Sequence, residues 1–334
     1  MKKSILVIAI LLLIFVSCKT DKEECAFQPK TSSIKIELQI EHLEDSIVSF
    51  TSKQQLVDFF SRHYVMRDIF FNHGGYPNDS VFINALYHRF QSPAIDTVLM
   101  ETKKVFGDGS ELKKEFTQAF TNLKFYYPEF QIPKIQTVIT GMESDLFISD
   151  TLIIVGLDYF LGNGAKYRPN MYDYMLKRYT KEFVVPSTML LYGIDSRINE
   201  VNVEDKSVLA DMIAYGKAYY FAKQILPCVP DSVFIGYTSK EIDGARENQD
   251  IIWKHLVEKE VFYSNVKNIK QKYIDERPKT IEIGDQCPGR IGVWMGWQIV
   301  NEYVKQNSQK TSLPKLMKVA NAQQIFKGSK FRPK

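Results

Sequence analysis

The segment that decides the fold is Thr151-Leu152-Ile153-Ile154-Val155-Gly156. It is an unbroken apolar run between a polar Thr and a Gly, and three of its four central residues are β-branched. A short apolar run without polar alternation is typical of a strand that is buried on both faces of a sheet. We therefore predict a central strand here. Leu157-Asp158-Tyr159-Phe160-Leu161-Gly162 follows it directly, and a turn-rich stretch covers residues 163–170.

Further strands and many helices surround this strand in the sequence. Residues 34–40 alternate apolar and polar with period two, which indicates a half-buried strand, and strands are also predicted over 135–140 and 146–148. Helices are predicted over about 53–71, 79–90, 94–106, 110–127, 171–183, 207–226, 238–262, 263–275, 291–304 and 313–320, followed by a basic tail. The sequence therefore predicts a predominantly helical α+β fold, a single domain over 31–334 around a small β-sheet.

The first eighteen residues have the pattern of a lipoprotein export signal. Lys2 and Lys3 precede an apolar run of twelve residues, which is shorter than the roughly 18–20 that span a bilayer, and Ser17-Cys18 follows it. We predict a signal peptide over 1–17, acylation of Cys18 with palmitate or a similar chain, and a tether over 18–30; a plain signal anchor is the alternative. The mature chain would be lipid-anchored in the cell envelope, at the outer membrane, facing the periplasm or the cell surface.

Composition and cysteine content limit which classes of protein and which disulfides remain possible. Apolar residues make up 45% of the 334 residues, which is too many for a disordered chain. A net charge of +4, with no Lys/Arg run longer than two, argues against a nucleic-acid partner. After Cys18, three cysteines remain, so at most one disulfide forms within the chain. The expected pair is Cys228–Cys287, because both lie in the folded part; two buried thiols are the alternative.

The sequence carries no recognised catalytic motif. It has no H-E-x-x-H, G-x-S-x-G or Walker A sequence, and His63 and His73 with Asp68 between them fit a helix face and a turn better than a metal site. We therefore predict no metal and no cofactor. The acidic stretch that includes Glu247 is interpreted as a solvated helix face rather than a paired-acid site. Gly292 and Gly296 indicate a close approach of two helices.

Several motifs together resemble a known family. They are Leu157–Gly162, the segment Asp211-Met212-Ile213-Ala214-Tyr215-Gly216-Lys217-Ala218-Tyr219-Tyr220-Phe221, Glu247 with Ile252-Trp253, and Pro288-Gly289-Arg290-Ile291-Gly292-Val293-Trp294-Met295-Gly296-Trp297-Gln298-Ile299-Val300. With the lipoprotein start, they resemble the gliding-motility lipoproteins of the GldB family of the Bacteroidetes. The resemblance selects five residues of these motifs as a candidate functional or structural surface: Asp158, Lys217, Glu247, Arg290 and Trp294.

The resemblance implies a non-enzymatic envelope lipoprotein that binds other envelope proteins of the motility or secretion machinery. A more distant resemblance links the family to a zincin-like scaffold. Tyr215-Gly216 stands where such enzymes can place a zinc-binding Glu beside a Gly, so the metal motif is absent. The alternative function is an envelope hydrolase or a degenerate zincin-like peptidase that binds peptide or glycan. Within 288–300 we expect a mainly structural helix, in which Arg290 opposes the helix dipole and needs an acidic partner such as Glu247 or Asp158.

Overall fold

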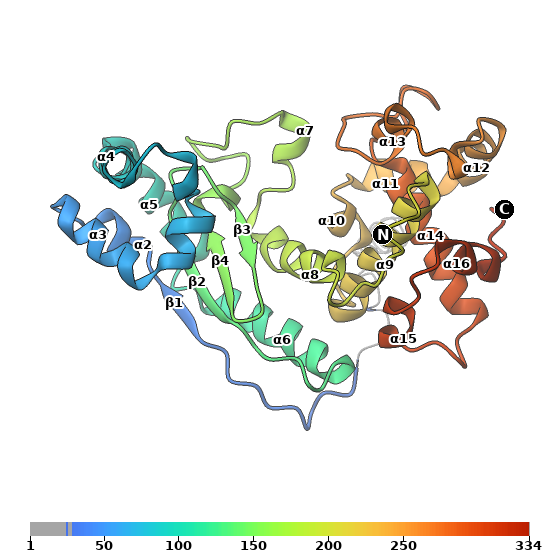
Figure 1. Cartoon of the computed structure of the whole chain (residues 1–334), viewed down its shortest axis with the longest axis horizontal. Coiled ribbons are helices and arrows are strands. Elements are labelled where there is room, and N and C mark those ends of the chain that lie inside the picture. Colours follow the sequence, from blue (N-terminus) through green and yellow to red (C-terminus); the bar gives the residue numbers. More distant parts are fainter. Residues whose placement is uncertain (1–24, 26–28, 334) are drawn as a thin grey trace, which may run out of the picture.

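Four short strands form one sheet in the order β1-β2-β4-β3 (Figure 1). The computed structural model describes residue 25 and residues 29–333, so the predicted signal peptide over 1–17 and Cys18 lie outside the described residues. β1 and β4 each run parallel to β2, whereas β3 is antiparallel to β4. On β4, Ile153 and Val155 join one hydrophobic cluster and Ile154 joins another. The prediction of a central strand buried on both faces is confirmed.

In residues 29–333, the strands all lie in the first half of the chain, and helices make up most of the second half. The strands are β1 (Ile40–His42), β2 (Lys134–Val138), β3 (Leu146–Ile148) and β4 (Leu152–Gly156). The α-helices are α2 (Glu44–Val48), α3 (Lys53–Arg62), α4 (Asp79–Phe90), α5 (Pro93–Phe106), α6 (Ser110–Tyr126), α7 (Asp173–Leu176), α8 (Val184–Ile194), α9 (Val208–Ile225), α10 (Asp231–Ile235), α11 (Ser239–Glu247), α12 (Gln249–Glu258), α13 (Lys267–Tyr273), α14 (Ile291–Gln306), α15 (Leu313–Met317) and α16 (Ala322–Ser329).

The sheet separates two hydrophobic clusters of unequal size. The smaller cluster joins one sheet face to α2–α5, which gather on one side of the strands in Figure 1. The larger cluster joins the other face to α6 and α8 and continues into the helices from α9 onward. The predicted α+β class, a helical domain around a small sheet, is therefore confirmed. Nothing in residues 29–333 supports the zincin-like scaffold.

Helices α9 and α14 form the centre of the second half because two glycines allow their backbones to touch. A Cβ atom on Gly296 would lie 1.9 Å from the carbonyl oxygen of Met212, and one on Gly216 would lie 2.5 Å from the carbonyl of Gly296. Next to this contact, the ring of Trp297 stacks on Tyr219 with centroids 5.4 Å apart. The expected close helix approach at Gly296 is confirmed, while Gly292 approaches the carbonyl of Tyr273 instead.

Several predicted elements differ from the structure. The helix predicted over 53–71 is divided into α3 and a π-helix over Met66–Phe70. The strand predicted over 34–40 is misplaced. β1 covers Ile40–His42, so only Ile40 of the predicted range lies in a strand, because β2 begins at Lys134 and the earlier residues run past its end. The helix predicted over 238–262 is divided at Asn248, whose side-chain amide donates to the carbonyl of Gly244 and so competes with the helical backbone. The expected helix over 171–183 is reduced to α7 and a 3-10 turn.

The chain after α15 is also more ordered than the predicted basic tail. It contains α16, which Asn321 caps by accepting from the backbone N–H of Gln324. Ile325 of this helix is fully buried. Among the residues of known placement, no helix is both long enough and apolar enough to cross a membrane.

Candidate functional site

Asp158 lies in the interior, directly after β4. Its carboxylate accepts hydrogen bonds from the backbone N–H groups of Thr140, at 3.0 Å, and Met142, at 2.7 Å, and from the Thr140 hydroxyl. Gly141 and Met142 both have left-handed backbone angles, so the carboxylate holds a strained turn at the end of β2. Burial raises the pKa of Asp158 to about 6, although the two backbone donors oppose this shift.

Lys217 lies in the middle of α9 with 1% of its surface exposed. Its ammonium group donates to the carbonyl oxygens of Glu200, at 2.6 Å, and Val319, at 2.9 Å, with Met317 farther away at 3.4 Å. Burial lowers the pKa of Lys217 to about 8. The side chain therefore ties α9 to the loop before it and to the end of α15, two segments that are far apart in sequence.

Arg290 and Trp294 lie together at the start of α14, and Trp294 is buried. The guanidinium of Arg290 donates to the hydroxyl of Tyr219, at 3.2 Å, and to the carbonyl of Ile235. Its acidic partner is Glu276, whose carboxylate is 3.5 Å from Nε. The expectation that Glu247 or Asp158 would balance the charge of Arg290 is therefore wrong, because the fold places Glu276, and neither of these residues, beside the start of α14.

The five candidate residues do not form one surface in this structure. Lys217 is on α9, the helix that packs against α14, whereas Asp158 belongs to the sheet region. Glu247 is exposed at the end of α11. Residues 29–333, with Cys25, hold no group of three or more His, Cys, Asp or Glu side chains that could bind a metal ion. His63 contacts Gln136, and His73 contacts Asp79 and Asp68.

The cysteines pair differently from the expectation. Cys25 forms the disulfide with Cys228, so the predicted Cys228–Cys287 pair is wrong. Cys287 is a half-buried free thiol, and burial raises its pKa to about 12. Cys25 lies within the segment predicted as a tether, so spacing gave no sign that it reaches the loop between α9 and α10. The disulfide joins residues that are 203 positions apart.

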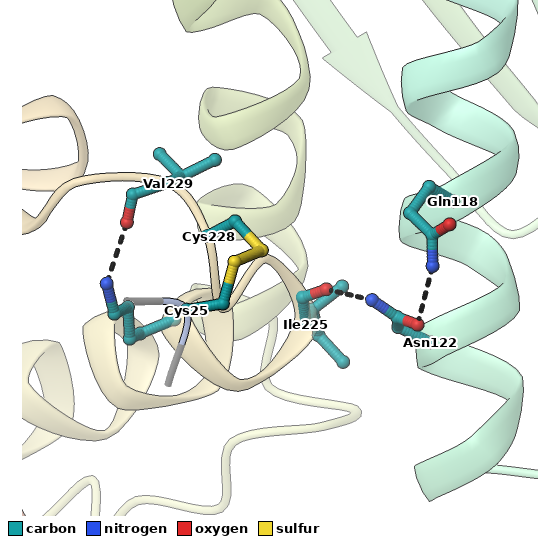
Figure 2. The surroundings of a disulfide bond; sticks show 7 residues. Cys25, Gln118, Asn122, Ile225, Cys228 and Val229 are labelled. Carbon is teal, nitrogen blue, oxygen red and sulfur yellow. Dashed lines mark hydrogen bonds between the residues drawn. A yellow bond between two sulfur atoms is a disulfide. The ribbon is translucent and has the colours of Figure 1, made fainter. Parts of the chain in front are cut away.

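A groove of about 850 Å³ lies beside this disulfide. One wall is α6, which is tied to the end of α9 because Asn122 donates to the carbonyl of Ile225 at 2.8 Å and receives a hydrogen bond from Gln118 (Figure 2). The other lining elements are the start of α8, the loop after α9 and residues near Pro29. The groove is larger than hollows of about 730 and 460 Å³ elsewhere, and its volume is in the range of ligand pockets.

The groove combines an apolar floor with an acidic rim. Its apolar lining includes Val185, Pro186, Leu226, Val229 and Val233. Its charged lining consists of three carboxylates, Glu111, Glu115 and Glu182, and one lysine, Lys114. The pKa of Glu115 is raised by partial burial and by the neighbouring negative charges of Glu111 and Glu182. Lys181 pairs with Glu111 at 2.9 Å beside the groove, which reduces the negative charge at that end.

Comparison with known proteins gives one result. A family model described as gliding motility protein GldB matches residues 24–333. The chain belongs to the GldB family. No curated protein and no solved structure matches it.

The GldB match covers nearly all of the chain, so it includes both cysteines of the disulfide, the groove and all five candidate residues. The sequence resemblance to the GldB family is thereby confirmed, and the chain is assigned as a gliding motility lipoprotein associated with the envelope. The groove was missed in the sequence because its walls come from four separate segments. The only local sign was Pro227-Cys228-Val229-Pro230, a rigid apolar loop with a cysteine.

Proposed function

We propose that this GldB family member is a non-enzymatic lipoprotein, anchored through Cys18 at the outer membrane, that binds another protein of the motility or secretion machinery in the groove beside Cys25–Cys228. The observation that carries the proposal is the combination of an apolar floor with a rim of three carboxylates and one lysine. An excess of negative charge around apolar surface favours a basic partner segment that also carries apolar side chains.

The disulfide supports a position of the groove close to the membrane. Cys25 is seven residues after Cys18, and an extended chain spans at most about 3.6 Å per residue. The proposed lipid attachment therefore lies within about 25 Å of Cys25, which is bonded to the groove residue Cys228. A partner in the groove would bind near the bilayer surface, where other envelope components are anchored.

The candidate polar residues support binding rather than catalysis. Asp158, Lys217 and Arg290 each use their charged groups on backbone groups or on partners inside the fold. None of the three lines the groove. A peptidase or hydrolase would instead need such groups to converge where a substrate can reach them.

Site-specific photocrosslinking in living cells tests the proposal. A photoreactive residue replaces Gln118, which is exposed in the groove wall, and in a matched control it replaces Gln54, which is exposed on α3 across the sheet. We expect a crosslink from position 118 alone, to a segment of an envelope protein with net positive charge. In the chain that carries the photoreactive residue at position 118, Glu115→Lys should reduce the crosslink yield several-fold, whereas Asp58→Lys on α3 should not.

Several results would contradict the proposal. Equal crosslinking from both positions, or an acidic captured segment, would exclude selective binding in the groove. A yield unaffected by Glu115→Lys would remove the role of the rim charge. Stoichiometric zinc that resists dialysis, or hydrolysis of peptide or glycan by the purified chain, would support the enzymatic alternative instead.

A further inference from the structure

A second site, separate from the groove, lies where the chain after α7 meets the start of α14. It is a polar cavity of about 20 Å³, which has room for one or two water-sized atoms. Its lining contains four cationic side chains and two carboxylates. The cations are Lys177, Arg178, Arg277 and Arg290, and the carboxylates are Glu241 and Glu276.

Two of the four cations pair with carboxylates other than Glu276. Lys177 pairs with Glu241 at 2.8 Å. Arg277 pairs at 3.1 Å with Glu282, which does not line the cavity, and it also donates to the carbonyl of Lys272. These pairs leave Arg178 and Arg290 with a single carboxylate between them.

That carboxylate is Glu276, and both guanidinium groups use the same oxygen. Arg178 Nη2 is 2.8 Å from Oε2, and Arg290 Nε is 3.5 Å from the same atom. A guanidinium has five N–H donors, and Arg290 uses two of them on Tyr219 and Ile235. One positive charge and several donors therefore remain uncompensated within the described part of the chain, at a site where Arg290 is largely buried.

The backbone at Arg290 increases this positive potential. Arg290 has a left-handed φ of 58° and stands at the N-cap of α14, which no side chain of the described residues caps. Helix N-termini carry partial positive charge, so an arginine at this position is unfavourable unless an anion is close. Glu276 supplies one carboxylate here, but Arg290 shares it with Arg178.

We propose that this cavity binds one carboxylate group, held between Arg178 and Arg290. A planar carboxylate matches the guanidinium fork, and only its two oxygens need to enter the cavity. The carboxylate belongs either to a small free acid or to a polypeptide, as a side chain or a C-terminus.

Thermal unfolding of the purified full-length chain tests the proposal. Sodium acetate is titrated at pH 7 against sodium chloride and sodium phosphate at equal ionic strength. We expect a saturable rise in Tm with acetate that chloride does not reproduce. Arg178→Gln should weaken the apparent Kd for acetate about tenfold or more, because it removes a charged donor. Arg246→Gln, which removes a surface arginine paired with Asp231, is the matched control and should leave the Kd unchanged.

A second variant, expected to strengthen rather than weaken acetate binding, distinguishes a change in binding from a change in stability. Glu276→Gln removes the competing carboxylate, so it should tighten acetate binding even if it lowers stability in chloride. Each shift in Tm is measured relative to the same variant in chloride, so a loss of stability alone cannot imitate a loss of binding. Equal responses of the wild type and Arg178→Gln would overturn the proposal, as would stabilisation by phosphate but not acetate.

A peptide arm distinguishes the two sources of the carboxylate. Three short peptides are compared: one with a free C-terminus, its amidated form, and an amidated form with one Glu. Saturation by the first or third peptide but not the second assigns the site to a polypeptide carboxylate. Saturation by acetate alone assigns it to a small free acid. Binding of the amidated neutral peptide, or of no carboxylate at all, would contradict the proposal.

Discussion

The contact between α9 and α14 makes Gly296→Ala the most informative single substitution. The added methyl group would lie 1.9 Å from the carbonyl oxygen of Met212, 2.5 Å from its carbonyl carbon and 2.9 Å from its Cα. Ordinary contact begins at 3.4 Å, so the two backbones must separate by about 1.5 Å. All three obstructing atoms are backbone atoms, so no rotamer change can relieve the clash.

Separating the two backbones also weakens the packing of the side chains around the contact. A gap of about 0.5–1 Å already removes a quarter to a half of the dispersion energy of the atoms involved. Those atoms include the stacked rings of Trp297 and Tyr219. Overpacking of a rigid core costs about 1–3 kcal/mol, whereas replacing a helical Gly by Ala can contribute up to about 1 kcal/mol of stability. We expect the net loss of stability to lie in the upper part of the range of about 1–3 kcal/mol. For a chain of this size, a loss of about 2–3 kcal/mol lowers Tm by about 4 °C.

The same substitution at Gly244 supplies the control. This glycine lies inside α11, and a Cβ atom there would meet nothing within 4 Å. Gly244→Ala should therefore stabilise the protein by about 0.5–1 kcal/mol through helix propensity alone. Urea unfolding and calorimetry of both variants measure the difference. A Gly296→Ala protein within about 0.5 kcal/mol of the wild type, or equal effects at the two sites, would refute this account of the helix contact.

The lipid anchor, the disulfide and the two buried charges can each be tested by a single substitution. Cys18→Ala should leave the chain soluble or unprocessed in membrane fractionation; unchanged processing and membrane association would contradict the lipid anchor. Cys228→Ser should lower the free energy of unfolding by about 2–5 kcal/mol, whereas Cys287→Ser, which breaks no disulfide, should change it far less in the same urea titration. Lys217→Met should lower it by about 2–3 kcal/mol because buried carbonyls lose their donor, and no loss would show that water replaces the ammonium. The pKa of Asp158 is about 6 in the fold against an ordinary 3.8, so its contribution to stability is present below about pH 4 and is lost as the pH rises through about 6. The difference in unfolding free energy between wild type and Asp158→Asn, measured from about pH 4 to about pH 7, should therefore change with pH. A difference that does not change with pH would exclude this effect.

The sequence predicted best those elements whose signal is local. The apolar run at 151–156 is enough to identify a doubly buried strand, and Ser207 and Thr238 cap helices through their own side chains. The two ends of α9 were therefore predicted within a residue. The strand predicted over 34–40 was misplaced, since β1 covers Ile40–His42; its position depends on where β2 begins, which its own residues do not encode.

The candidate site was harder to predict because its parts meet only in space. Periodicity shows that Arg290 opens a helix, but nothing local indicates that Glu276 rather than Glu247 will reach it. Cys25 was expected in a tether, and its bond to Cys228 depends on the path of the chain between them. The groove depends on the same path, since its walls belong to α6, α8 and the loop after α9.

The buried charges explain why residues that identify the family need not identify its binding surface. Asp158 fixes a left-handed turn, Lys217 joins carbonyls 17 and 102 positions away, and Arg290 reaches a carbonyl 55 positions away. Each acts as a link between distant segments, so its loss should reduce folding and protein level together with function. A motility defect at these positions would therefore not by itself locate a partner. Exposed residues of the groove that link no distant segments, such as Lys114, are the positions at which loss of binding can be separated from loss of the protein.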